Sequence, residues 1–326
     1  MNRRYDPLFP ATTVLTMALH PNMRPVIDIS SLPDISRDEH EFHDTSFFQS
    51  QAGRTVHLPS PTEVLREHPN LSNGVAIYED LNLVVKFDDL RFLRREEAQA
   101  LRAIRQAFPD GEVPVPEVFG WKVCGHRMFL YMSLIVGKTL REAWPLLTKH
   151  DKIAISTELS HIVTALRRVS PDPSGPFIGS VSRGPVQDRF FHFDHVEGPF
   201  LTIKSFQDWL LAAATRQQVR PGEEVVVLDG LYRDWLPDTG NICLTHGDLT
   251  IDNIIISSDE HGAYHIAGII DWEQAGWYPE YWEYFKLYYG VEIDHKWRTE
   301  GWADKVMKPF EDEFTAVAEY FLWRNP

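Results

Sequence analysis

Residues 244–283 decide the fold, and they read LTHGDLTIDNIIISSDEHGAYHIAGIIDWEQAGWYPEYWE. Three polar side chains, His246, Asp248 and Asn253, fall in one short turn, and Asp271 directly follows an apolar run. β-rich sequence flanks both groups, so we expect a hairpin with polar groups where its strands begin and end. Carboxylate and amide oxygens in such an arrangement can hold a divalent cation.

This combination of side chains predicts phosphoryl transfer. Such a reaction asks the protein mainly to position the reactants and to place positive charge over the phosphoryl oxygens. We expect Asp248 to orient and deprotonate an acceptor hydroxyl, and Asn253 and Asp271 to bind the metal ion. The order His, one residue, Asp, four residues, Asn also matches the catalytic loop of protein kinases.

The pattern HGDxxxxN followed by IDWExAG resembles the aminoglycoside phosphotransferase and choline kinase-like family, which phosphorylates small molecules and has a protein-kinase-like fold. Gly247 stands where protein kinases carry an arginine that contacts a phosphorylated activation segment. The short path over 271–283 also lacks a segment for docking a protein substrate. The resemblance covers about residues 70–290 and implies ATP and Mg²⁺ as cofactors.

Upstream, the β-rich runs 74–78 and 83–87 predict a second hairpin with a turn between them. The second run carries Lys86, which resembles the lysine that grips the nucleotide phosphates in kinases. Taken alone, this residue fits a strand lysine that faces solvent better than a nucleotide-binding one.

Residues 94–104 are rich in helix-forming side chains and follow the hairpin directly. Kinases hold the nucleotide-binding lysine with a glutamate from this helix. The family's Glu-Ala spacing selects Glu97 as the partner of Lys86, and Glu96 is the alternative.

Two further features concern the nucleotide. The apolar strand that leads to a glycine turn resembles the hinge between kinase lobes, so the Ser133 carbonyl and the Ile135 amide are the expected adenine contacts. The glycine-rich phosphate loop departs from the protein-kinase pattern, because only Ser-Asn-Gly at 72–74 precedes the first strand. The residues that cover the phosphates are therefore unassigned.

We expect an α+β, two-lobed, protein-kinase-like fold with a small β-rich N-lobe and a larger, mainly helical C-lobe. Residues 1–54 carry turn-forming residues without periodicity and predict an irregular N-terminal arm. The nucleotide-binding N-lobe is expected at 55–132, and the catalytic and substrate-binding C-lobe at 133–326. Within the C-lobe, 175–198 reads as an irregular insert, where this family gathers substrate contacts.

The composition sets limits on partners and compartment. The chain has 326 residues, of which 43% are hydrophobic, and a formal net charge of -15, which disfavours nucleic acid as a partner. An acidic surface tolerates a cationic substrate, but it also simply keeps a protein dissolved. Two isolated cysteines indicate a reducing compartment. The first 21 residues lack a cleavage site, and no apolar run spans a membrane, so we expect a cytoplasmic protein.

Several residues near the catalytic stretch have two interpretations. His246 could act in acid-base chemistry or hold the loop together, and the family favours the second role. Asp252 is a second carboxylate in the loop that we expect on the surface. Glu283 stands where the family carries an aspartate that steadies the loop. Downstream acidic and aromatic side chains could cage a cation or simply pack together: Glu273, Trp277, Glu280, Tyr281, Trp282 and Glu283.

The resulting hypothesis is an ATP- and Mg²⁺-dependent phosphotransferase that acts on a hydroxyl of a small molecule, which could be cationic. One alternative is a pseudokinase-like nucleotide-binding or scaffold protein. Such proteins typically lose the lysine, the catalytic aspartate or a metal ligand, and this sequence keeps all of them. A second alternative is a protein kinase. The sequence identifies neither the acceptor nor the oligomeric state.

Overall fold

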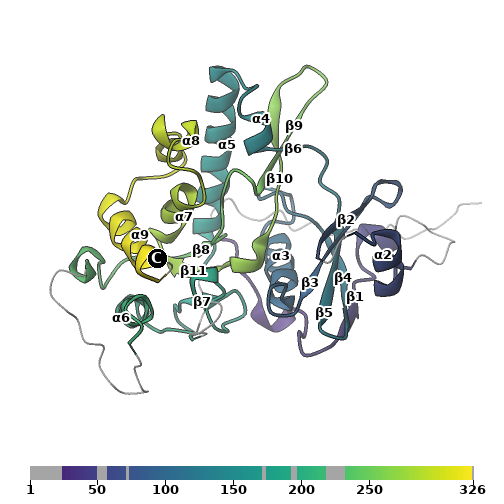
Figure 1. Cartoon of the computed structure of the whole chain (residues 1–326), viewed down its shortest axis with the longest axis horizontal. Helices are drawn as coiled ribbons and strands as arrows, with labels where there is room; N and C mark the ends of the chain where they lie inside the picture. The colour runs from purple at the N-terminus through teal and green to yellow at the C-terminus, as the bar shows by residue number, and fades with distance from the viewer. Residues whose placement is uncertain are drawn as a thin grey trace, which may run out of the picture.

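The structure is a computed structural model that describes residues 24–49, 57–70, 73–170, 174–191, 197–217 and 232–324. Its elements gather into two lobes side by side, one built on a β-sheet and the other mostly of helices (Figure 1). This arrangement confirms the predicted α+β, two-lobed, protein-kinase-like fold.

The N-lobe is built on a five-stranded antiparallel sheet in the order β1-β4-β5-β3-β2. Its strands are β1 (Glu39–Glu41), β2 (Gly74–Tyr78), β3 (Leu83–Asp89), β4 (Val118–Cys124) and β5 (Arg127–Ser133). In β3 the side chains of Leu83, Val85 and Phe87 are fully buried. Because side chains alternate along a strand, Lys86 points to the opposite face, toward the C-lobe.

Part of the predicted N-terminal arm departs from the expected irregular structure. β1 pairs with β4, and Phe42 continues the contact by donating its amide hydrogen to the Phe119 carbonyl over 2.8 Å. Phe42 also packs edge-on against Trp121 of β4. A strand of three residues is too short to show an alternating pattern in the sequence, which is why it was missed. Residues 1–23 lie outside the described residues.

Two helices cover the N-lobe sheet. α2 (Pro61–Glu67) begins after Ser60, which forms a reciprocal capping box with Glu63. α3 (Arg95–Ala107) is the predicted helix after the hairpin, and it buries Ala98, Leu101 and Ile104. The short 3₁₀ helices of this half are η1 (Ile29–Ser31) and η2 (Glu79–Leu81), and α1 (Ser46–Gln49) is a single turn.

The C-lobe surrounds the long helix α5 (Lys149–Arg168), which packs against β8 (Ile242–Thr245) and β10 (Tyr264–Ile269). β10 forms the predicted hairpin with β9 (Ile254–Ser258), and β6 (Lys138–Thr139) adds a third strand. A second small sheet has the order β7-β11-β8, with β7 (Gly179–Ser180) and β11 (Gly276–Pro279).

The other C-lobe helices pack around this centre (Figure 1). They are α4 (Leu140–Ala143), α6 (Ile203–Ala214), α7 (Trp282–Tyr289), α8 (Lys296–Thr299) and α9 (Glu311–Arg324). Four 3₁₀ helices join them: η3 (Arg189–Phe191), η4 (Arg233–Trp235), η5 (Trp272–Gln274) and η6 (Ala303–Lys305). Within the described residues, no helix combines the length and the apolar character needed to cross a bilayer.

Candidate active site

The HGD turn after β8 is shaped by a glycine. Gly247 has φ +79°, a conformation that favours glycine. A Cβ atom at this position would lie 2.4 Å from the backbone oxygen of Gln274, so no larger side chain fits without a shift. The structure thus gives a steric reason why this loop has no arginine next to its histidine.

His246 links the HGD turn to the end of the hairpin that precedes Asp271. Its Nδ1 accepts the amide hydrogen of Asp248 over 3.1 Å, and its Nε2 lies 3.0 Å from the carbonyl of Ile270, next to Asp271. Because Nδ1 accepts, Nε2 carries the proton and donates. The ring is fully buried, and burial lowers the pKa of His246 to about 4. A neutral ring bonded to backbone on both sides supports the interpretation of His246 as a scaffold residue.

Asp248 and Asn253 face each other across the turn. The Asn253 amide group donates to the backbone oxygen of Asp248 over 2.8 Å and to its carboxylate over 3.2 Å. The Asn253 Oδ1 atom accepts no hydrogen bond from the described part of the chain, so it is available as an oxygen ligand. Burial raises the pKa of Asp248 above its ordinary value. A raised pKa makes the carboxylate a better proton acceptor.

Glu283 lies beneath the turn and is 3% exposed. Its two carboxylate oxygens accept the amide hydrogens of His246 over 2.7 Å and of Gly247 over 3.3 Å. This geometry matches the steadying role expected at this position. Burial raises the pKa of Glu283 to about 7, although the two amide donors favour its ionised form.

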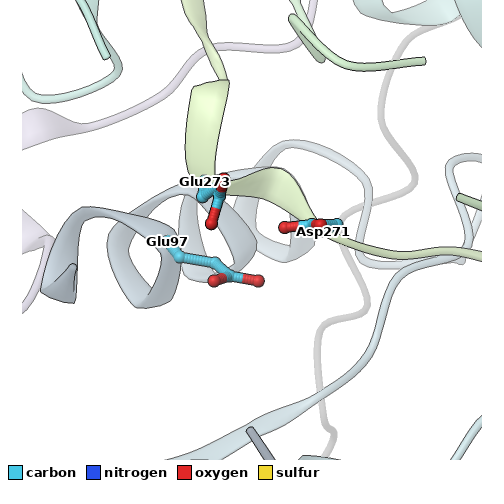
Figure 2. Close-up of side chains that lie close together, drawn as sticks. All are labelled: Glu97, Asp271 and Glu273. Atoms are coloured by element: carbon cyan, nitrogen blue, oxygen red, sulfur yellow. The ribbon is translucent and has the colours of Figure 1, made fainter. Parts of the chain in front are cut away.

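Lys86 lies at the centre of a group of carboxylates on the other side of the cleft. Its Nζ is 2.9 Å from Glu97, 2.7 Å from Asp271 and 3.4 Å from Glu273. Figure 2 shows these three carboxylates pointing toward one another, from α3 and from the segment that begins η5. Burial lowers the pKa of Lys86, but the three carboxylates outweigh it and raise the pKa above its usual range.

The structure distinguishes the two candidate partners of Lys86. Glu97 is buried and holds the ammonium, whereas Glu96 is only half-buried and makes no ion pair with it. Burial raises the pKa of Glu97, and Lys86 lowers it only in part. Burial also raises the pKa of Asp271, but the Lys86 ammonium dominates and brings the net value below the ordinary one.

A cavity of about 220 Å³ lies beside this ion-pair group, between the two lobes. Apolar side chains line most of it, together with the predicted hinge: Val75, Val84, Leu101, Pro116, Met132, Ser133, Leu134, Ile135, Ile255 and Ile270. The amide of Leu134 donates to the Asn82 carbonyl over 3.1 Å. The amide of Ile135 has no acceptor in the described part of the chain, so it is the hinge amide that is available to a ligand.

The aromatic residues downstream of Asp271 do not form a cage. Trp277, Tyr281 and Trp282 are buried in the core, and Trp282 stacks on Tyr278 with ring centroids 5.5 Å apart. The packing interpretation therefore applies to them. Glu273 is different, because its carboxylate contacts Lys86 and also Arg189, a residue that the sequence did not single out.

Asp252, expected on the surface, is ion-paired. Its two carboxylate oxygens accept hydrogen bonds from the Arg141 guanidinium over 2.6 and 2.8 Å. The side chain is 47% exposed, as expected of a surface residue, and its ion pair is with Arg141. It is therefore a structural neighbour of the turn, separate from the group around Lys86.

Comparison with known proteins gives the family of the chain. Two lobes with a lysine, a glutamate and two aspartates at their junction define a protein-kinase-like phosphotransferase fold. The model of the phosphotransferase enzyme family matches residues 75–318, and the chain belongs to that family. A search of the curated proteins finds no match.

Three solved structures illustrate the similarity. The aminoglycoside phosphotransferase APH(3'')-Id from Streptomyces rimosus, in complex with ADP and streptomycin, is 18% identical, with a TM-score of 0.43 over 81% of this chain and 97% of that one. APH(2'')-IIa in a ternary complex with streptomycin and ATP is 18% identical, with a TM-score of 0.45 over 81% and 86%. An aminoglycoside-3'-phosphotransferase of type VIII is 14% identical, with a TM-score of 0.44 over 73% and 84%.

Proposed function

We propose that this protein transfers the γ-phosphoryl group of ATP to a hydroxyl of a small molecule in a Mg²⁺-dependent reaction. Family membership supplies the phosphotransferase class. The observation that carries the finer proposal is the contact of Lys86 with both Glu97 and Asp271 in the cleft. This arrangement places a cation for the phosphates beside an expected metal ligand.

The nucleotide is proposed to bind between the N-lobe, residues 55–132, and the C-lobe, residues 133–326. Apolar side chains from both lobes suit the two faces of a planar base. The available amide of Ile135, with the neighbouring Ser133 carbonyl, would supply the donor and acceptor that adenine needs. Lys86, held by Glu97, would contact the phosphates.

The residues present also suit a magnesium ion. Asn253 offers a side-chain oxygen with no other donor among the described residues, and Asp271 offers a carboxylate. Mg²⁺ prefers oxygen ligands of this kind. When bound with the nucleotide, the ion would supply positive charge to the phosphoryl oxygens.

The proposed reaction assigns Asp248 the role of base. The acceptor oxygen forms a bond to the γ-phosphorus, the bond from that phosphorus to the β–γ bridging oxygen breaks, and ADP leaves. The proton of the acceptor hydroxyl passes to Asp248. The Asn253 amide group orients the Asp248 carboxylate, and burial raises the pKa of that carboxylate so that it accepts a proton more readily.

The acceptor is proposed to be a small hydroxylated molecule of still unassigned structure. The net charge of -15 is compatible with a cationic acceptor and argues against nucleic acid. We also propose a cytoplasmic location, which fits an ATP-dependent reaction and two cysteines that remain free. Retention of Lys86, Asp248 and Asp271 in one cleft argues against a pseudokinase, and the short path after Asp271 argues against a protein kinase.

The test is acceptor-stimulated ADP release with a panel of amino alcohols, sugars and aminoglycosides. We expect wild type to turn over at least one of them, and Asp248→Asn to reduce turnover by about 10³-fold. Asp252→Asn is the matched control, because it removes a carboxylate of the same loop that pairs with Arg141. Equal and negligible turnover by wild type and Asp248→Asn, with no binding of Mg·ATP, would overturn the enzyme proposal.

A further inference from the structure

Arg189 reaches the cleft from the irregular insert of the C-lobe. It begins η3, and its Nε donates to Oε1 of Glu273 over 2.7 Å, with Nη2 at 2.5 Å from the same oxygen. The other oxygen of Glu273 lies 3.4 Å from the Lys86 Nζ. Figure 2 shows Glu273 beside Asp271, with their carboxylates turned toward the same space. Glu273 thus joins Arg189 to the proposed nucleotide-binding lysine.

The backbone around Arg189 is held by a buried network. The amide of Arg189 donates to Oε1 of Gln274 over 3.1 Å, and the Lys286 Nζ donates to the same oxygen over 3.1 Å. The preceding residue, Asp188, has a fully buried side chain that pairs with Lys286 at 2.7 Å and accepts from the Trp282 indole at 3.0 Å. Such a pair adds little net stability, but it fixes geometry, since breaking it leaves an uncompensated buried charge.

The guanidinium itself stays accessible although its backbone is fixed. The Arg189 side chain is 60% exposed, whereas its partner Glu273 is only 10% exposed. Burial lowers the pKa of Arg189, but the carboxylates of Glu273, Asp248 and Asp271 raise it to a net value above the ordinary one. Arg189 therefore lies in the electric field of both the proposed base and the proposed metal ligand.

We propose that Arg189 contacts the γ-phosphoryl group of bound ATP, and that Glu273 positions it for that contact. This inference rests on the proposed function. In the proposed reaction the transferred group lies between Asp248 and Asp271, and a carboxylate oxygen of Glu273, which holds the Arg189 guanidinium, lies within 4.8 Å of one of Asp271. A guanidinium presents a planar set of donors that matches phosphoryl oxygens, and it stays charged at every relevant pH.

The test compares nucleotides with and without a γ-phosphate. Affinities for Mg·ADP and for Mg²⁺ with the imido-bridged, non-hydrolysable ATP analogue are measured by calorimetry for wild type, Arg189→Ala, Arg189→Lys and Arg168→Ala. We expect Arg189→Ala to bind Mg·ADP within about twofold of wild type and the analogue about tenfold more weakly. Arg189→Lys falls between. Arg168→Ala, which removes an exposed arginine paired with Glu112, matches wild type.

The outcomes separate this inference from the proposed function. If wild type binds neither nucleotide, both fail. A second outcome is that wild type binds both nucleotides, and Arg189→Ala either weakens the two affinities equally or changes neither affinity. The proposed function then stands, and the role of Arg189 is overturned. An unchanged nucleotide affinity with a raised KM for an anionic acceptor would also overturn it. Thermal unfolding checks each variant, and Arg189→Gln replaces Arg189→Ala, under the same criteria, if the latter does not fold.

Discussion

The ammonium of Lys86 lies 2.7 Å from the carboxylate of Asp271, although 185 positions separate the two residues in the chain. Lys86 belongs to β3 of the N-lobe, and Asp271 follows the last strand of the C-lobe hairpin with a φ of 64°. The ion pair therefore joins the two lobes at the cleft. The same ammonium also offsets the repulsion among three neighbouring carboxylates, those of Glu97, Asp271 and Glu273.

Replacing this ammonium should destabilise the protein as well as weaken nucleotide binding. We expect Lys86→Met to lower the free energy of unfolding by about 3 kcal/mol, because Glu97, Asp271 and Glu273 lose their common counter-ion. Denaturant titration measures this loss, and calorimetry measures the affinity for Mg·ADP. Lys122→Met is the control, since Lys122 lies in the same sheet and pairs with Glu41 at 2.9 Å. Equal nucleotide affinity in the two variants would contradict the role given to Lys86.

Gly247→Ala should disrupt the catalytic turn for two separate reasons. Alanine would have to adopt the positive φ of this position, and its methyl group would lie 2.4 Å from the Gln274 backbone oxygen. We expect a loss of about 3 kcal/mol in the free energy of unfolding and a larger loss of turnover. Gly262→Ala separates the two effects, because Gly262 has φ +80° but open space around it, and it should lose only about 1 kcal/mol. Similar losses in both variants would mean that the Gln274 contact does not shape the turn.

Glu283→Gln should impair the reaction without altering the proposed base. The substitution keeps one oxygen acceptor but places an amino group against a backbone donor of the turn, either His246 or Gly247. We expect the free energy of unfolding to fall by about 2 kcal/mol and turnover to fall further than stability explains. Glu280→Gln tests the same chemistry three residues earlier, where the carboxylate accepts from Asn241. Wild-type turnover in Glu283→Gln would show that the turn does not need its carboxylate.

The buried histidine predicts a specific dependence of stability on pH. The pKa of His246 is lowered from 6.5 to about 4 in the folded protein, so between these values the unfolded chain binds more protons. The contribution of His246 to the free energy of unfolding is complete above pH 6.5 and is lost as the pH falls toward 4. Compared with His246→Gln, wild type should therefore lose about 3 kcal/mol of unfolding free energy between pH 7 and pH 4.

This pH effect must be measured as a difference between proteins. Burial raises the pKa of Glu283 to about 7 and also raises that of Glu97, so both favour the folded state as the pH falls. These opposing contributions are shared by wild type and His246→Gln, and they cancel when the two stability curves are subtracted. A difference that stays constant from pH 7 to pH 4 would show that His246 is not held neutral.

Much of the site could be anticipated because its chemistry is local in sequence. The HGD turn, Asn253 and the hairpin that ends before Asp271 all depend on neighbouring residues and on alternating strands. The choice of Glu97 over Glu96 rested on family spacing, and the burial of Glu97 agrees with it. The strand at 39–41 was missed, because three residues carry too little periodicity and its stability comes from pairing with β4.

The sequence alone indicated the fold class, through the resemblance of its HGDxxxxN and IDWExAG motifs to a known family, and the residues that could perform phosphoryl transfer, through local ligand types. Only the tertiary structure decided that Glu273 joins Lys86 to Arg189, and that a buried Asp188–Lys286 pair holds the insert at the cleft. The physical reason is that these contacts join an irregular segment to η5 and to α7, more than 80 positions away. Ion pairs between residues so far apart leave no periodic pattern in the chain, and they form only when the folded chain brings the charges together.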